Sequence, residues 1–102
     1  MRLSDESLRG RTVIASDGLA IGSIAVLFID IDGWRVESLQ VKLHKEVADR
    51  LGADRSWLRA GVVEIPIRII QSVGDAVVLT LGVDELRQVL PGTSESAPGP
   101  AP

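Results

Sequence analysis

Short apolar runs separated by turn residues occupy most of the chain. The pairs Asp17-Gly18, Asp32-Gly33 and Gly74-Asp75 each lie between two runs rich in Val, Ile and Leu. An Asp-Gly pair between apolar runs is typical of a β-hairpin, because glycine adopts positive φ without steric cost and aspartate tolerates it. The pattern therefore predicts a small antiparallel β domain.

The apolar positions also indicate how the central strands are bent. The segment Ala20–Asp32 carries aliphatic side chains at both odd and even positions. This predicts a strand that is buried on both faces or bent between two sheets, as in a small barrel. Gly22 predicts a bulge or sharp bend there, since it has no side chain to pack. In the returning segment the alternation changes phase after Val36, which predicts a β-bulge near Glu37-Ser38.

Further strands are predicted on either side of this pair. Thr12–Ser16 precedes the first turn as a short β-branched run, and residues 63–69 alternate strictly between apolar and other residues. Pro66 in the second run cannot donate to a β ladder. We therefore expect that strand at a sheet edge or broken at the proline.

Three helical stretches are expected. Residues 44–52 predict a helix that ends at Gly52, and residues 53–61 predict a further helical turn. Residues 83–90 have apolar positions one turn apart, which predicts a short amphipathic helix that Pro91-Gly92 stops.

Length and composition set the domain organisation. The 102 residues suit one domain. Residues 91–102 are rich in Pro, Ser and Gly, so we expect a disordered tail after a domain of residues 1–90. Aromatic residues make up 3% of the chain, so the core must be built from Val, Ile and Leu, which suits sheets. The predicted fold class is mainly β: a small antiparallel β-barrel with a short helical insert and a C-terminal helix.

Composition excludes several classes of function. The chain has no Cys, which excludes a disulfide scaffold, a zinc ribbon and a thiol nucleophile. Its first residues are charged and lack the apolar region of a signal peptide, and its longest apolar run, Ile24–Ile29, is too short to span a bilayer. We expect a cytoplasmic protein without direct membrane insertion. The net charge of −3 gives no general attraction to nucleic acid.

The order of the motifs resembles a known family. The motifs are Gly10-Arg11-Thr12-Val13, Ser16-Asp17-Gly18, Ile21-Gly22, Glu64-Ile65-Pro66 and Ser72-Val73-Gly74-Asp75. In this order they resemble PRC-barrel domains, over the chain from about Leu8 to Leu81. Similar domains form the cytoplasmic part of the photosynthetic reaction-centre H subunit and half of a bacterial ribosome-maturation factor.

The resemblance implies a stand-alone, archaeal-type member of that family. The family has no established catalytic residues, so the resemblance implies no enzyme activity, no catalytic site and no cofactor. It implies an adaptor role, in which the surface of the barrel holds a partner protein, often within a homodimer. Some archaeal stand-alone members are linked to the cell-division machinery.

Each residue that could act in catalysis or ligand binding also has a structural explanation. His44 is the only histidine, and no Ser-His-Asp arrangement supports it as a catalyst. Asp30 and Asp32 share strand parity and could bind a divalent cation with Asp17. Aspartate favours such turns for backbone reasons alone, however, so no metal site is assigned. Binding of RNA by Arg9, Arg11 and Arg35 would need exposed aromatic residues between them, and the chain has few.

The candidate interface residues are Trp34, Pro66, Leu86, Val89 and Leu90. Trp34 follows a tight turn, and tryptophan is enriched at interface hot spots. The alternative is that the tryptophan covers one end of the core. Leu86 and its neighbours form the apolar face of the last helix, which either contacts a partner or covers a barrel mouth.

Two functions remain open, with an enzyme or small-ligand binder ranked last. The first is a non-enzymatic protein-protein interaction module that self-associates as a homodimer, such as a scaffold in archaeal-type cell division. The second is an accessory protein for RNA processing or ribosome maturation. Even then the contact with nucleic acid would run through a ribonucleoprotein partner.

Overall fold

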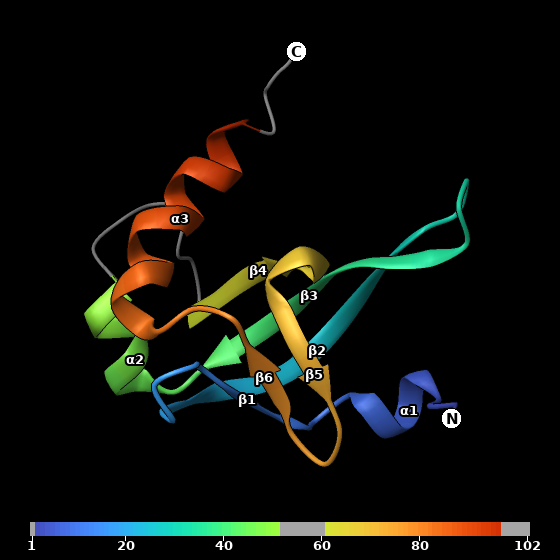
Figure 1. Ribbon diagram of the computed structural model, residues 1–102, viewed down its shortest axis with the longest axis horizontal. Helices are drawn as coiled ribbons and strands as arrows, with labels where there is room; N and C mark the ends of the chain where they lie inside the picture. Colours follow the sequence, from blue (N-terminus) through green and yellow to red (C-terminus); the bar gives the residue numbers. More distant parts are fainter. Residues whose placement is uncertain (1, 52–60, 97–102) are drawn as a thin grey trace.

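The computed structural model describes residues 2–51 and 61–96, with side chains described as far as residue 89. Its elements in chain order are α1 (Asp5–Leu8), β1 (Thr12–Ile14), β2 (Ala20–Asp30), β3 (Arg35–Leu43), α2 (Lys45–Leu51), β4 (Val62–Pro66), the 3-10 helix η2 (Ile67–Ile69), β5 (Ile70–Val73), β6 (Val77–Leu79) and α3 (Val83–Ser96). The strands form one sheet in the order β4-β3-β2-β1-β6-β5, and α2 and α3 pack together beside one end of it (Figure 1). The predicted mainly β fold is confirmed.

The sheet differs from the expectation in two respects. Strands β1 and β6 pair in parallel, whereas the other neighbouring strands pair antiparallel. This follows from the β5–β6 hairpin, which turns the chain back so that β6 runs in the direction of β1. The described hydrogen-bond pairing also does not close the sheet into a barrel. Its edge strands β4 and β5 are nevertheless consecutive in the chain and are joined by η2.

The structure contains the β-bulge and the irregular backbone at Gly22 that the sequence predicted. The register between β2 and β3 shifts between Phe28 and Ile29, where Glu37 is the extra residue on β3. At Gly22 the two strands approach so closely that a Cβ atom would lie 2.1 Å from the carbonyl oxygen of Lys42. The β1–β2 register also shifts beside this glycine. Glycine is therefore required at position 22 by contact with the neighbouring backbone.

Pro66 also behaves as predicted. Strand β4 lies at an edge of the sheet and ends at this proline, and η2 follows directly. Since an edge strand leaves one row of donors without a ladder partner, the missing N–H of proline costs little there.

Aliphatic side chains from the sheet and from helices α2 and α3 build the core. The fully buried set comprises Val13, Ile21, Val41, Leu51, Ile65, Val77, Leu79, Val83 and Leu86. Strands supply most of these residues, and α2 and α3 add Leu51, Val83 and Leu86. Val, Ile and Leu thus provide the burial that the shortage of aromatic residues made necessary.

The helices agree with the sequence in part. Helix α2 spans Lys45–Leu51, inside the predicted stretch, whereas the helical turn predicted over 53–61 falls largely outside the described residues. The stop predicted at Pro91-Gly92 is wrong, because α3 continues to Ser96. A proline removes its own N–H, so a helix can pass it with one hydrogen bond fewer. Residues 91–96 of the expected tail belong to α3, and residues 97–102 lie outside the described residues.

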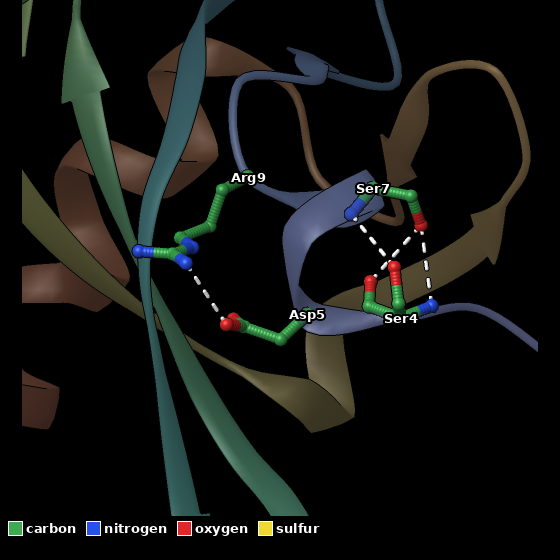
Figure 2. A network of polar contacts seen from close by, with 4 residues as sticks. All are labelled: Ser4, Asp5, Ser7 and Arg9. Carbon is green, nitrogen blue, oxygen red and sulfur yellow. Dashed lines mark hydrogen bonds and ion pairs between the residues drawn. The ribbon is translucent and has the colours of Figure 1, made fainter.

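Helix α1 was not predicted. Figure 2 shows its N-terminus, where Ser7 N donates to Ser4 Oγ at 3.0 Å and Ser4 N donates to Ser7 Oγ at 3.2 Å. This reciprocal capping box satisfies two free donors, and an ion pair of 3.1 Å between Asp5 and Arg9 adds to it. The signal in the sequence was weak, because the usual second member of the box is Glu or Gln rather than Ser.

Candidate interaction surface

The β2–β3 hairpin extends beyond the rest of the sheet. Strand β1 pairs with β2 as far as Ser23, and β4 pairs with β3 from Ser38 onward. From the pair Ile29–Val36 to the turn, the hairpin therefore leaves the sheet as two strands paired only with each other. We call residues 26–37, which comprise this part and its base, the distal ribbon, and the hairpin projects from the body in Figure 1. A two-stranded ribbon is marginally stable in water by itself, so a ribbon of this kind gains from a covering partner.

The distal ribbon is rich in exposed apolar side chains. They are Val26, Phe28, Ile29, Ile31 and Trp34, and the last two are 68% and 79% exposed. Single exposed apolar residues are ordinary on a protein surface, whereas five of them on one projecting hairpin, spread over both of its faces, indicate an interaction site. The ribbon is therefore the strongest candidate for an interaction surface in the described part of the chain.

The backbone at the tip of the ribbon is strained. The expected positive φ at Gly33 is not present, and Trp34 instead adopts φ of 53°. A left-handed backbone is costly for a bulky residue, and such strain persists where the surroundings or a function maintain it. Over the turn, the Arg35 side chain folds back so closely that a Cβ at Gly33 would meet its Nε at 2.8 Å. The flexible arginine side chain can move aside, so this contact does not by itself require glycine at position 33.

An apolar cavity of about 230 Å³ lies between the base of the ribbon and the other half of the sheet. Its lining residues are Leu3, Leu8, Ile24, Leu27, Val36, Leu39, Ile67, Ile70, Val73 and Val77. Leu3, Ile67 and Val73 remain about two-fifths exposed at its mouth. The cavity offers no polar side chain to orient a substrate, so its chemistry is suited to apolar contact rather than to catalysis.

The first turn is connected to the last helix through Asp17. Its Oδ1 accepts a hydrogen bond from Leu19 N at 3.1 Å, and its Oδ2 accepts one from Val83 N at 3.3 Å. These two backbone donors, led by that of Leu19, lower the pKa of the Asp17 carboxyl below its ordinary value. The charge also lies at the positive end of α3, where an anion is favourable. Asp17 is thereby a structural group, as its place in a turn predicted.

Comparison with known families agrees with this geometry. The model of the PRC-barrel domain matches residues 2–86. The chain belongs to the PRC-barrel domain family. A search of curated proteins found no match. PRC-barrel domains are general, non-catalytic modules that occur in protein-protein interaction and ribosome-processing contexts.

The structure separates the five candidate interface residues of this PRC-barrel domain. Trp34 is the most exposed of the large apolar residues whose side chains the structure describes, and Pro66 is half-buried at the sheet edge. Leu86 is fully buried in the core, so it serves the alternative role of covering the core and does not belong to the exposed surface. Val89 is half-buried, and the Leu90 side chain is outside the described part. The structure places Trp34 and Leu86 at opposite extremes of exposure.

The residues that could act in catalysis or bind a metal ion are scattered over the PRC-barrel domain. His44 is exposed, and its carbonyl oxygen accepts a hydrogen bond from Ala48 N at the start of α2. Asp30 Oδ1 accepts a hydrogen bond from Asp32 N at 3.0 Å, which stabilises the turn. Within residues 2–51 and 61–96, no three His, Asp or Glu side chains gather in a way that could hold a metal ion.

The arginines do not form a common patch. Arg9 pairs with Asp5, and Arg11 donates to the backbone carbonyls of Ser7 and Gly74. Arg35 begins β3 at the distal ribbon, away from α1 in Figure 1. The described helices include none with the length and apolar character needed to cross a membrane.

Sequence reasoning identified Trp34, but not the rest of the distal ribbon, as a candidate surface. It predicted that Ala20–Asp32 is buried on both faces or bent between two sheets, whereas Phe28, Ile29 and Ile31 are exposed. A signal was present in the sequence: the partners available to pair with this segment are shorter than the segment itself. An overlong apolar strand with short neighbours must extend beyond them.

Proposed function

We propose that this PRC-barrel domain is a non-enzymatic protein-interaction module that self-associates and binds other proteins through the distal ribbon. The observation that carries the proposal is the group of exposed apolar side chains on residues 26–37, with Trp34 79% exposed. Exposed aromatic residues on a projecting element are typical anchors of protein interfaces. The non-catalytic character of the family supports the same conclusion. Use as a scaffold in cell division is one such role.

A role in ribosome maturation is the weaker alternative. It would favour a basic surface that attracts RNA phosphates. Two of the candidate arginines, Arg9 and Arg11, are instead engaged within the chain. If the domain acts on ribosomal particles, the contact we propose is with a protein of the particle.

Affinity purification from the native host, with sedimentation of the pure chain, tests the proposal. The Ile31→Lys variant places a charge on the distal ribbon and should lose both bound proteins and self-association. The Gln71→Lys variant adds the same charge at an exposed position of β5 and should retain both. A wild-type chain that sediments as a monomer and captures no protein would rule the proposal out.

A further inference from the structure

We propose that residues 26–30 of β2, which we call the open edge, bind an extended segment of a partner protein. The segment adds one strand to the sheet and carries Lys or Arg near the hairpin tip. The inference rests on the proposed function for the premise that the distal ribbon binds other proteins. It adds the mode of binding and the chemistry of the partner. Three features of the open edge carry it: an unpaired backbone, the lack of any protection against pairing, and the nearby negative charge.

The neighbouring strand on one side of β2 ends early. Ile24 N donates to the Arg11 carbonyl oxygen at 3.0 Å and Gly10 N donates to the Ile24 carbonyl oxygen at 2.7 Å, at the end of the β1–β2 ladder. Ala25 is then an extra residue on β2, and a bulge of this kind terminates pairing. Gly10 adopts a φ of 91°, where the chain connects α1 to β1 instead of continuing beside β2. In residues 2–51 and 61–96, no strand pairs with 26–30 on this side.

The open edge presents backbone donors and acceptors in a row. In an antiparallel pair, every second residue directs its N–H and C=O away from the neighbouring strand. Strand β3 is the neighbour of the open edge in the described part of the chain, so those groups point to the other side. Five residues span about 17 Å at 3.3 Å per residue, which is an ordinary strand length. An extended peptide beside β2 can therefore form a ladder of main-chain hydrogen bonds there.

The outer strands of the sheet carry features that discourage strand addition, whereas the open edge does not. Strand β4 exposes Glu64 and ends at Pro66, and β5 has four residues, of which Gln71 and Ser72 are polar and exposed. Charged side chains, proline and short length are the usual protection of sheet edges. The open edge instead has four apolar residues before Asp30. An exposed apolar edge of this kind is a template for pairing with another chain.

Side chains on both faces of the open edge are apolar. Val26 and Phe28 share one face and are 38% and 37% exposed, while Leu27 and the 51% exposed Ile29 share the other. Neighbouring side chains on the same face of two paired strands contact each other. The added strand therefore needs apolar side chains on both faces, of the β-branched or aromatic kind that strands favour.

The charge of the distal ribbon favours a basic partner over a second copy of this chain. The ribbon has three carboxylates against one guanidinium, those of Asp30, Asp32, Glu37 and Arg35. The open edge itself contains no Lys or Arg, so a second copy of it supplies no cation to these carboxylates. Two open edges paired about a two-fold axis at their middle residue would also place Asp30 opposite the apolar Val26. A foreign strand with Lys or Arg at the tip gains electrostatic complementarity instead.

Hydrogen exchange of the isotope-labelled full chain, measured by NMR with and without peptide, tests the proposal. The probe is a panel of seven-residue peptides with Lys at both ends and central residues drawn from Val, Ile, Thr and Phe. A bound peptide should slow amide exchange within the open edge at least tenfold and leave the amides of β5 unchanged. The same peptide methylated on its backbone nitrogens keeps its side chains but cannot donate, and it should not bind. Glu in place of both Lys residues should weaken binding.

Two lysine substitutions distinguish the edges. Ile29→Lys protects the open edge and should weaken peptide binding at least tenfold, whereas the matched control Gln71→Lys, on the exposed edge of β5, should bind as the wild type does. Asp30→Asn should weaken binding and make it less sensitive to salt.

Each other outcome has a defined meaning. If no peptide of the panel protects the open edge while the wild type still captures host proteins that Ile31→Lys loses, strand addition is wrong and the proposed function stands. If the open edge becomes protected without peptide as the protein concentration rises, and no peptide binds, a second copy is the occupant and the proposal is also wrong. A chain that binds no peptide, captures no protein and sediments as a monomer would overturn both.

Discussion

The carboxylate of Asp17 accepts a hydrogen bond from the backbone N–H of Val83, a residue 66 positions later in the chain. The contact joins the first hairpin turn to the first turn of α3. In addition, Gly82 N donates to Glu85 Oε1 at 2.8 Å, so two carboxylates satisfy donors at the start of this helix. The position of α3 over the core therefore depends on an exposed turn at the other end of the sequence.

Replacing Asp17 with Asn should lower stability in a pH-dependent way. The variant can still accept from Leu19 but presents an amide donor or a neutral oxygen to Val83. Since the pKa of Asp17 is lowered in the folded state, its contribution is present above the unfolded pKa and is lost as pH falls through the folded pKa. Urea unfolding at several pH values between 7 and 3 should show a wild-type advantage that is constant at neutral pH and shrinks as the pH falls below the ordinary aspartate pKa of 3.8. The matched control is Asp75→Asn in the exposed β5–β6 turn. Equal losses of stability in Asp17→Asn and Asp75→Asn would contradict the stabilising role of the Asp17 carboxylate.

Gly22→Ala should destabilise the fold by roughly 3 kcal/mol, because strands β2 and β3 must separate to admit the added methyl group. Chemical denaturation monitored by circular dichroism measures the change. Gly74→Ala is the matched control, since a Cβ there meets nothing within 4 Å and φ is not in the left-handed region. That variant should be stabilised by about 0.4–1 kcal/mol through the unfolded state. Similar effects at both positions would be evidence against the close backbone approach.

Leu86→Ala should cost about 3 kcal/mol of unfolding free energy, because it leaves a hole where α3 meets the core. Dimerisation measured at a temperature where the variant is folded should be unchanged. Arg87→Ala, at the next and exposed position, should change stability little. A variant that folds normally but no longer self-associates would restore Leu86 to the interface.

Trp34→Gly should stabilise the isolated monomer by about 1 kcal/mol, since glycine adopts the left-handed conformation without the clash of a Cβ. The measurement is best made at a protein concentration low enough for the chain to be monomeric. Trp34→Ala keeps the Cβ and should show no such gain. If alanine and glycine give the same stability, strain at this position is negligible.

Local patterns predicted the strands well, because the phase of alternation reports which face is buried. The break after Val36 located the bulge at Glu37, and Pro66 located a sheet edge. Features that depend on distant contacts were not predictable in this way. The parallel β1–β6 pair, the capping of α3 by Asp17 and the burial of Leu86 all depend on how elements meet in space.

The tip of the hairpin shows the same limit at a single residue. Asp32-Gly33 was correctly interpreted as a turn, yet the positive φ belongs to Trp34. Turn type depends on loop length, and the loop here spans four residues between Asp30 and Arg35. Exposure of the ribbon likewise depends on where β1 and β4 end, which the apolar pattern of β2 alone does not report.

The short link η2 has a consequence for growth of larger assemblies. It joins β4 to β5, so the two edges of the sheet meet at one place instead of facing away from each other. A foreign strand that pairs with one edge near this link would leave less room for a second strand at the other edge. Open-ended polymers need two separate docking surfaces, so the connectivity of the chain works against edge-to-edge growth.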